Sequence, residues 1–226
     1  MWDFKHKQPI LNIKDHIGEA FSVSWNNSLN NLITSSGMDS TVKIYDLQKG
    51  SCFQTLVGHK GVAYNVTWHP TVNNVLASAS ADRTVKIWDM KAGKCIKTII
   101  AGAGGSEVLH CDFNKYENII ATAGSDGTLN VFDLKGTGDI PIISMRSHML
   151  TARKVMFSPF FPSIMASVGY DMNVVVWDIK KSAPVSTFKH HREFVMGLDF
   201  SVFNNKKIAT CSWDRTLTLY DFDQQF

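Results

Sequence analysis

Apolar and polar residues alternate at every second position in many short segments along the chain. FSVSW (21–25), TVKIWD (84–89) and VMFS (155–158) follow this pattern, which places one set of side chains on each face of an extended strand. These runs are rich in β-branched and aromatic residues, and Gly, Asn, Asp and Pro separate them. No segment keeps a helical period over about 11 residues. The pattern predicts an all-β protein with short strands in a meander.

A second period of 43 to 45 residues connects the predicted strands. Five copies end in an aromatic-Asp pair, carry another Asp seven residues before the Asp of that pair, and carry Ser or Thr four residues earlier. Four copies have His 23 residues before the first Asp, and Gly104 occupies that place in the third. The repeated polar and Trp positions are His16, Ser35 and Asp39; His59, Ser78, Asp82 and Trp88; Thr122 and Asp126; His148, Ser167, Asp171 and Trp177; and His191, Thr210 and Asp214.

Four strands within a period of about 40–45 residues are typical of one blade of a β-propeller. These motifs resemble the WD-repeat family along essentially the whole chain. The copies divide one domain, residues 1–226, into repeats at about 4–46, 47–89, 90–133, 134–178 and 179–221.

The resemblance implies that His, Ser or Thr, Asp and Trp of one blade form a hydrogen-bonded chain. On this basis the chain is complete in the second and fourth copies, through Trp88 and Trp177. Tyr45 and Tyr220 are poorer substitutes, and Phe132 has no donor at all.

We therefore expect the third blade to be the least stable. Native-state hydrogen exchange tests this ranking, because amides exchange fastest where local unfolding is easiest. Protection of the third blade among the strongest in the protein would contradict it.

The number of blades is a separate question, because the family usually has seven or eight and this sequence shows five. Trp2-Asp3 lies 43 residues before Asp46 and looks like the end of an earlier copy. We expect five blades of a seven-bladed ring, with the N-terminal blades lacking. The alternative is a five-bladed ring, in which a strand at PILNI (9–13) pairs with the last blade and removes its open edge.

Composition and charge exclude several classes of function. The net charge is +3, and 23 Lys and Arg are scattered among 20 Asp and Glu, which does not indicate a nucleic-acid partner. No apolar stretch approaches the 18–20 residues of a membrane span, and the N-terminus lacks a secretory signal. The four cysteines have no CxxC spacing, and we expect them to be reduced. The sequence therefore predicts no cofactor and no direct membrane insertion.

His, Asp and Ser together also suggest a hydrolase or a metal site. However, the set recurs in nearly every copy, whereas an enzyme needs one triad beside one oxyanion hole. An enzyme would need an unrepeated polar set in the central channel, and the sequence reveals none. His190 and His191 are adjacent and would point to opposite faces of a strand, and His6, His69 and His110 lack companions at metal-ligand spacing. We predict no catalytic residue and no metal ligand.

The loops before each innermost strand and the turns before each third strand form the face on which propellers bind partners. Three positions per copy point to this face, and aromatic side chains are frequent there. Exposed aromatic residues on one face favour a recognition site. The candidate peptide-binding residues are Glu19, Phe21, Tyr64, Glu107, Arg153, Tyr170, Phe194 and Trp213.

A more specific resemblance rests on longer segments. HIGEAFSVSW (16–25), VLHCDFNKYEN (108–118), ARKVMFSPFFPSIMASVGYD (152–171), HHREFVMGLDFS (190–201) and ATCSWDRTLTLYD (209–221) resemble the family of receptors for the type-2 peroxisomal targeting signal. The resemblance implies a cytosolic receptor that shuttles to the peroxisome and binds the N-terminal amphipathic helix of matrix enzymes such as thiolase. It also implies a co-receptor peroxin and docking peroxins at the peroxisomal membrane.

Within that resemblance, Glu19 occupies an acidic position that contacts cargo. We expect Glu19 to pair with an Arg of the helix, with Glu107 as the second choice. The alternative is a generic WD-repeat scaffold or substrate adaptor that binds another peptide on the same face.

Overall fold

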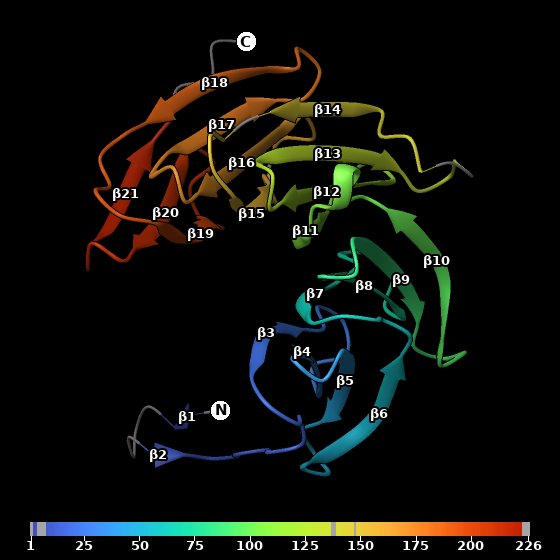
Figure 1. Ribbon diagram of the computed structural model, residues 1–226. Coiled ribbons are helices and arrows are strands. Elements are labelled where there is room, and N and C mark those ends of the chain that lie inside the picture. The colour runs from blue at the N-terminus through green and yellow to red at the C-terminus, as the bar shows by residue number, and fades with distance from the viewer. Residues whose placement is uncertain (1, 4–7, 137–138, 147, 223–226) are drawn as a thin grey trace.

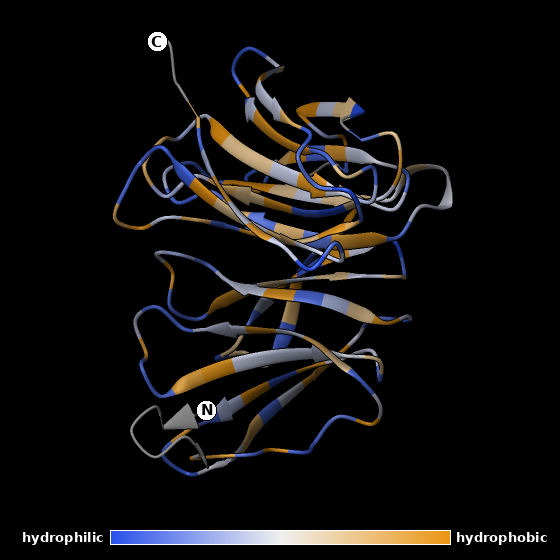
Figure 2. Cartoon of the chain, turned by 90° about the vertical axis from the view of Figure 1, so that its left-hand side faces the viewer, coloured by the Kyte–Doolittle hydropathy of each residue, from blue (hydrophilic) through white to orange (hydrophobic). Residues whose placement is uncertain are grey.

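The structure, a computed structural model, describes residues 2–3, 8–136, 139–146 and 148–222. The described part of the chain forms five antiparallel sheets and one two-stranded hairpin. The fold is all-β, as predicted, and only a single 3₁₀ turn at Ala103–Gly105 departs from strand and loop. Apolar and polar residues alternate along the strands, as Figure 2 shows by hydropathy.

Each of the first four sheets is a meander of four strands, and the fifth has three. In chain order the strands are β3 (Ala20–Trp25), β4 (Leu32–Gly37), β5 (Thr41–Asp46) and β6 (Ser51–Val57); β7 (Ala63–Trp68), β8 (Val75–Ser80), β9 (Thr84–Asp89) and β10 (Lys94–Ile100); β11 (Val108–Phe113), β12 (Ile119–Gly124), β13 (Thr128–Asp133) and β14 (Ile143–Arg146); β15 (Ala152–Phe157), β16 (Ile164–Gly169), β17 (Val174–Asp178) and β18 (Ala183–Phe188); and β19 (Val195–Phe200), β20 (Lys207–Ser212) and β21 (Leu217–Asp221). Each sheet is one blade, and its outermost strand comes from the residues after the aromatic-Asp pair.

The blades follow one another along an arc, with β3, β7, β11, β15 and β19 as the inner strands (Figure 1). Four apolar clusters fill the spaces between successive blades. For example, Val42 and Ile44 of the first blade share a cluster with Val66 and Trp68 of the second. Each strand face is therefore buried against the neighbouring blade, which explains why residues on both faces of the middle strands are apolar or small.

The expected strand at PILNI (9–13) is largely absent. Only β2 (Gln8–Pro9) forms at its start, and it pairs with β1 (Trp2–Asp3). β21 pairs with β20, and the hairpin lies away from it across the open side of the arc (Figure 1). The five-bladed ring is therefore not formed, because the rotation from blade to blade does not bring the first and last blades together.

The turn between the second and third strands of each blade positions the repeated Asp. The next residue has a positive φ in all five copies: Ser40, Arg83, Gly127, Met172 and Arg215. This left-handed residue reverses the chain so that the Asp carboxylate accepts the main-chain N–H two residues on, as Asp39 does from Thr41 at 3.1 Å. Non-glycine residues in this region cost about 1 kcal/mol or more each, and the carboxylate bonds offset that cost.

Candidate functional site

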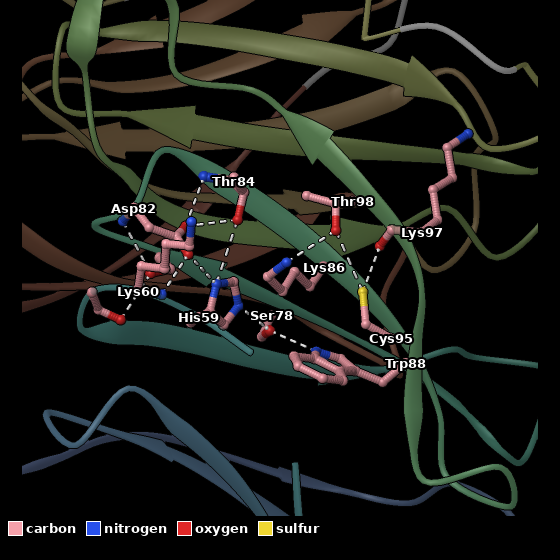
Figure 3. A network of polar contacts seen from close by, with 12 residues as sticks. His59, Lys60, Ser78, Asp82, Thr84, Lys86, Trp88, Cys95, Lys97 and Thr98 are labelled. Atoms are coloured by element: carbon pink, nitrogen blue, oxygen red, sulfur yellow. Dashed lines mark hydrogen bonds and ion pairs between the residues drawn. The ribbon is translucent and has the colours of Figure 1, made fainter. Parts of the chain in front are cut away.

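The hydrogen-bonded chain is complete in the second blade (Figure 3). His59 Nδ1 lies 2.8 Å from the Asp82 carboxylate and His59 Nε2 lies 2.6 Å from Ser78 Oγ. Trp88 Nε1 donates to the same hydroxyl at 2.8 Å. Asp82 also accepts the N–H of Lys60 and both donors of Thr84. The network ties the inner loop, the second strand and the third strand of one blade together.

The fourth blade repeats this arrangement. His148 joins Asp171 and Ser167 at 2.8 Å each, and Trp177 Nε1 donates to Ser167 Oγ at 2.9 Å.

The first and fifth blades carry Tyr in place of Trp, and the two behave differently. His16 contacts Asp39 and Ser35, and the Ser35 hydroxyl donates to Tyr45 Oη at 3.3 Å. His191 contacts Asp214 and Thr210, but the buried Tyr220 hydroxyl has no hydrogen-bond partner among the described residues. The chain of bonds therefore extends to the aromatic residue in the first blade and ends at Thr210 in the fifth.

In the third blade the network is replaced by apolar packing. Phe132 is buried in the cluster between the second and third blades, and Thr122 Oγ1 donates to the Asn130 carbonyl at 3.4 Å. Asp126 accepts two bonds from Thr128. The expected lower protection of this blade stays a prediction.

The turn carboxylates have lowered pKa values. Partial burial opposes the shift for Asp39 and Asp171, but bonds from hydroxyl, His ring and main-chain donors outweigh it and bring both pKa values to about 2. A carboxylate with a lowered pKa stabilises the fold above its ordinary pKa near 3.8, and this stability is lost as the pH falls toward 2. The repeated networks therefore protect the fold at neutral pH and make it sensitive to acid.

Six of the eight predicted binding residues contact one another in two groups. Phe21 meets Tyr64 edge to face, with ring centroids 5.6 Å apart, and the Tyr64 hydroxyl donates to Glu107 at 3.0 Å. These residues come from three successive blades. Burial and the Glu107 carboxylate raise the pKa of Tyr64, so the phenol stays a donor and orients this carboxylate.

The second group lies on the fourth and fifth blades. Tyr170 stacks on Phe194 with ring centroids 4.5 Å apart, and Phe194 lies 5.3 Å from Trp213. Trp213 is 60% exposed, so the group presents apolar ring surface to solvent. Such amphipathic rings contribute strongly to peptide binding.

Glu19 and Arg153 stand apart from these contacts. The Glu19 side chain is exposed and makes no ion pair or hydrogen bond with any described residue, although its carbonyl accepts the Met38 N–H. Arg153 is half-buried and interacts electrostatically with Tyr64. A free carboxylate on one side and oriented rings on the other suit a ligand with a cationic and an apolar side.

The inner strands carry an unrepeated polar set that sequence reasoning missed. Asp112 accepts the N–H of Phe157 in the next blade at 2.8 Å, and Lys154 interacts electrostatically with both Asp112 and Asp199. The expectation that no such set exists was therefore wrong. Equal spacing in each repeat would have shown that positions 112, 154 and 199 lie on the inner strands. The Asp112 contact joins two blades, so it has a structural explanation.

Asp112→Asn tests this contact through pH. Burial raises the pKa of Asp112 to about 7, so the folded protein holds a proton that the unfolded chain has lost between pH 4 and 7. Stability from this group therefore falls as the pH rises through 7. Asn still accepts the Phe157 N–H but cannot ionise.

We expect the variant to match the wild type at pH 5 and to exceed it by about 2 kcal/mol at pH 8. Urea denaturation at both pH values measures the difference. A difference that does not change with pH would contradict the assignment.

Metal and membrane features are limited in the described part of the chain. No group of three His, Cys, Asp or Glu side chains there could hold a metal ion. The described residues also contain no helix long and apolar enough to span a bilayer.

Comparison with known proteins identifies the repeat. The family described as "WD domain, G-beta repeat" matches residues 7–46, 50–89, 93–133 and 182–221. This chain belongs to the WD-repeat family. The match covers four of the five copies, so WD-repeat membership rests on most of the chain.

Two similar relatives are named peroxisomal targeting signal 2 receptor. The mouse protein is 42% identical over 82 residues, which are 36% of this chain and 26% of the mouse protein. The Dictyostelium discoideum protein is 40% identical over 67 residues, 29% of this chain and 21% of that protein. Nuclear distribution protein PAC1 of Candida dubliniensis is 35% identical over 80 residues, 34% of this chain and 16% of PAC1. The alignments thus span about a quarter or less of these relatives.

Proposed function

We propose that this WD-repeat protein is a peroxisomal import receptor that binds the N-terminal helical type-2 signal of matrix enzymes. The resemblance of its segments to this receptor family supports the proposal, and so do the names of the mouse and Dictyostelium relatives. The observation that carries it is the joined set Phe21, Tyr64 and Glu107, which combines ring surface with an oriented carboxylate. A co-receptor peroxin, docking peroxins, cargo such as thiolase, and shuttling between cytosol and peroxisome belong to the same proposal.

An amphipathic helix fits this face for physical reasons. Its apolar side packs on the ring groups, and a cationic side chain reaches a carboxylate. Glu19 is the better partner for an Arg, because its carboxylate is exposed and makes no other contact among the described residues. Glu107 already accepts the Tyr64 hydroxyl, so it fixes the position of the ring as well as supplying charge.

Glu19→Lys tests the proposal with a fluorescent type-2 signal peptide. We expect the dissociation constant to rise at least tenfold, or about 1.4 kcal/mol, because an ion pair becomes a repulsion. The melting temperature should not change, since the side chain is exposed.

Glu117→Lys is the matched control, because Glu117 is an exposed carboxylate in the β11–β12 loop on the opposite face. Unchanged affinity in Glu19→Lys would remove Glu19 from the site. No binding of the signal peptide to the wild type would favour the scaffold alternative, which the similarity to PAC1 also leaves open.

A further inference from the structure

An apolar pair at equal positions on every inner strand is buried in four blades and exposed in one. The buried pairs are 6% exposed or less: Val66 and Trp68, Cys111 and Phe113, Val155 and Phe157, and Leu198 and Phe200. In the first blade the equivalent Val23 and Trp25 are 68% and 49% exposed. The first blade therefore presents an apolar surface that its four equivalents cover. We call this surface, with Val23 and Trp25 at its centre, the leading face.

A second apolar pair lies on the third strand of each blade and shows the opposite trend. The buried pairs are 4% exposed or less: Val42 and Ile44, Val85 and Ile87, Leu129 and Val131, and Val174 and Val176. In the last blade the equivalent Leu217 and Leu219 are 70% and 66% exposed. We call the surface around this pair the trailing face.

The two pairs meet each other at the interfaces within the chain. Val42 and Ile44 share one cluster with Val66 and Trp68, and Val174 and Val176 share another with Leu198 and Phe200. A third-strand pair of one blade thus covers an inner-strand pair of the next. The leading and trailing faces are the two complementary halves of this same interface.

The leading face is also hollowed. A hollow of about 650 Å³ lies over it, between the segment 11–15 and the first blade. Its lining includes Ile13, Val23, Trp25, Tyr45 and Leu47. The space is large enough to take apolar side chains from another sheet.

We propose that the occupant of the leading face is a second copy of this chain, which docks its trailing face there. The contact continues the interface that already joins the blades, with Leu217 and Leu219 in the role of Val42 and Ile44. The two surfaces differ, so the association is heterologous and runs head to tail. The trailing face is the narrower half, because its blade has three strands, and the association is reversible and concentration-dependent. This proposal does not depend on the proposed function.

Two single-face variants and their mixture test it by sedimentation velocity. The wild type forms species above the monomer mass of 25.3 kDa as its concentration rises toward about 100 µM, the range of a weak interface. Trp25→Arg removes the leading face and Leu219→Arg removes the trailing face, so each alone is monomeric. An equimolar mixture regains one intact interface and forms dimers but nothing larger.

Phe203→Arg is the matched control, because Phe203 is 97% exposed in a loop outside both faces, and it associates like the wild type. Circular dichroism melting shows whether each variant is folded, and Val23→Arg and Leu217→Arg replace any variant that is not. A monomeric wild type at about 100 µM, a monomeric mixture, or a single-face variant that still associates would each overturn the proposal.

Discussion

Asp82→Ala lowers the free energy of unfolding by about 3 kcal/mol, whereas Asp126→Ala at the equivalent turn lowers it by about 1 kcal/mol. Asp82 accepts from His59, from Lys60 and twice from Thr84. Its loss leaves a buried His ring without the acceptor that orients it toward Ser78. Asp126 accepts only the two donors of Thr128, so less is lost.

Urea denaturation of both variants measures this difference. The pair is well matched, since both residues occupy the same turn position and differ in the presence of the His. Equal losses would show that the His chain adds nothing to the bonds within the turn. Asp82 also has a lowered pKa, so Asp82→Ala should lose less of its remaining stability in acid than the wild type does.

Phe194→Ala weakens binding of the type-2 signal peptide about 30-fold, or about 2 kcal/mol. Phe194 lies between Tyr170 and Trp213, with ring centroids 4.5 and 5.3 Å away. Its removal takes ring surface from the centre of the group and releases both neighbours. The free energy of unfolding should fall by only about 1 kcal/mol.

Fluorescence anisotropy with the labelled peptide measures the affinity. Phe203→Ala is the control, because it deletes an exposed Phe in the β19–β20 loop on the opposite face. If both variants bind like the wild type, the second ring group is no part of the binding site. A large loss in Phe203→Ala would instead place the site on the other face.

Much of this architecture could be predicted from spacing alone. The 43- to 45-residue period places Asp39, Asp82, Asp126, Asp171 and Asp214 at equivalent turns, and all five precede a left-handed residue. A strand rises a constant distance per residue, so fixed spacing keeps each His, Ser or Thr and Asp at a fixed relative position. The three-stranded last sheet also follows from the position of Tyr220-Asp221 near the end of the described residues.

Other features depend on small differences within the same pattern. Tyr45 and Tyr220 occupy equivalent positions, but only Tyr45 receives a bond from the hydroxyl two strands away. The Tyr220 ring stacks on Phe188, with centroids 4.4 Å apart, and local packing of this kind decides where a hydroxyl points. Spacing along the chain contains no information on such packing.

The sequence by itself determined the strands, the turns, the blade period and the WD-repeat family of this protein. Only the tertiary structure decided which blades meet, and with them the Tyr64–Glu107 bond, the Asp112–Phe157 contact and the exposed pairs at the two ends of the arc. The physical reason is that distances along a strand follow from residue spacing. Contacts between blades, in contrast, depend on how each sheet rotates and packs against the next.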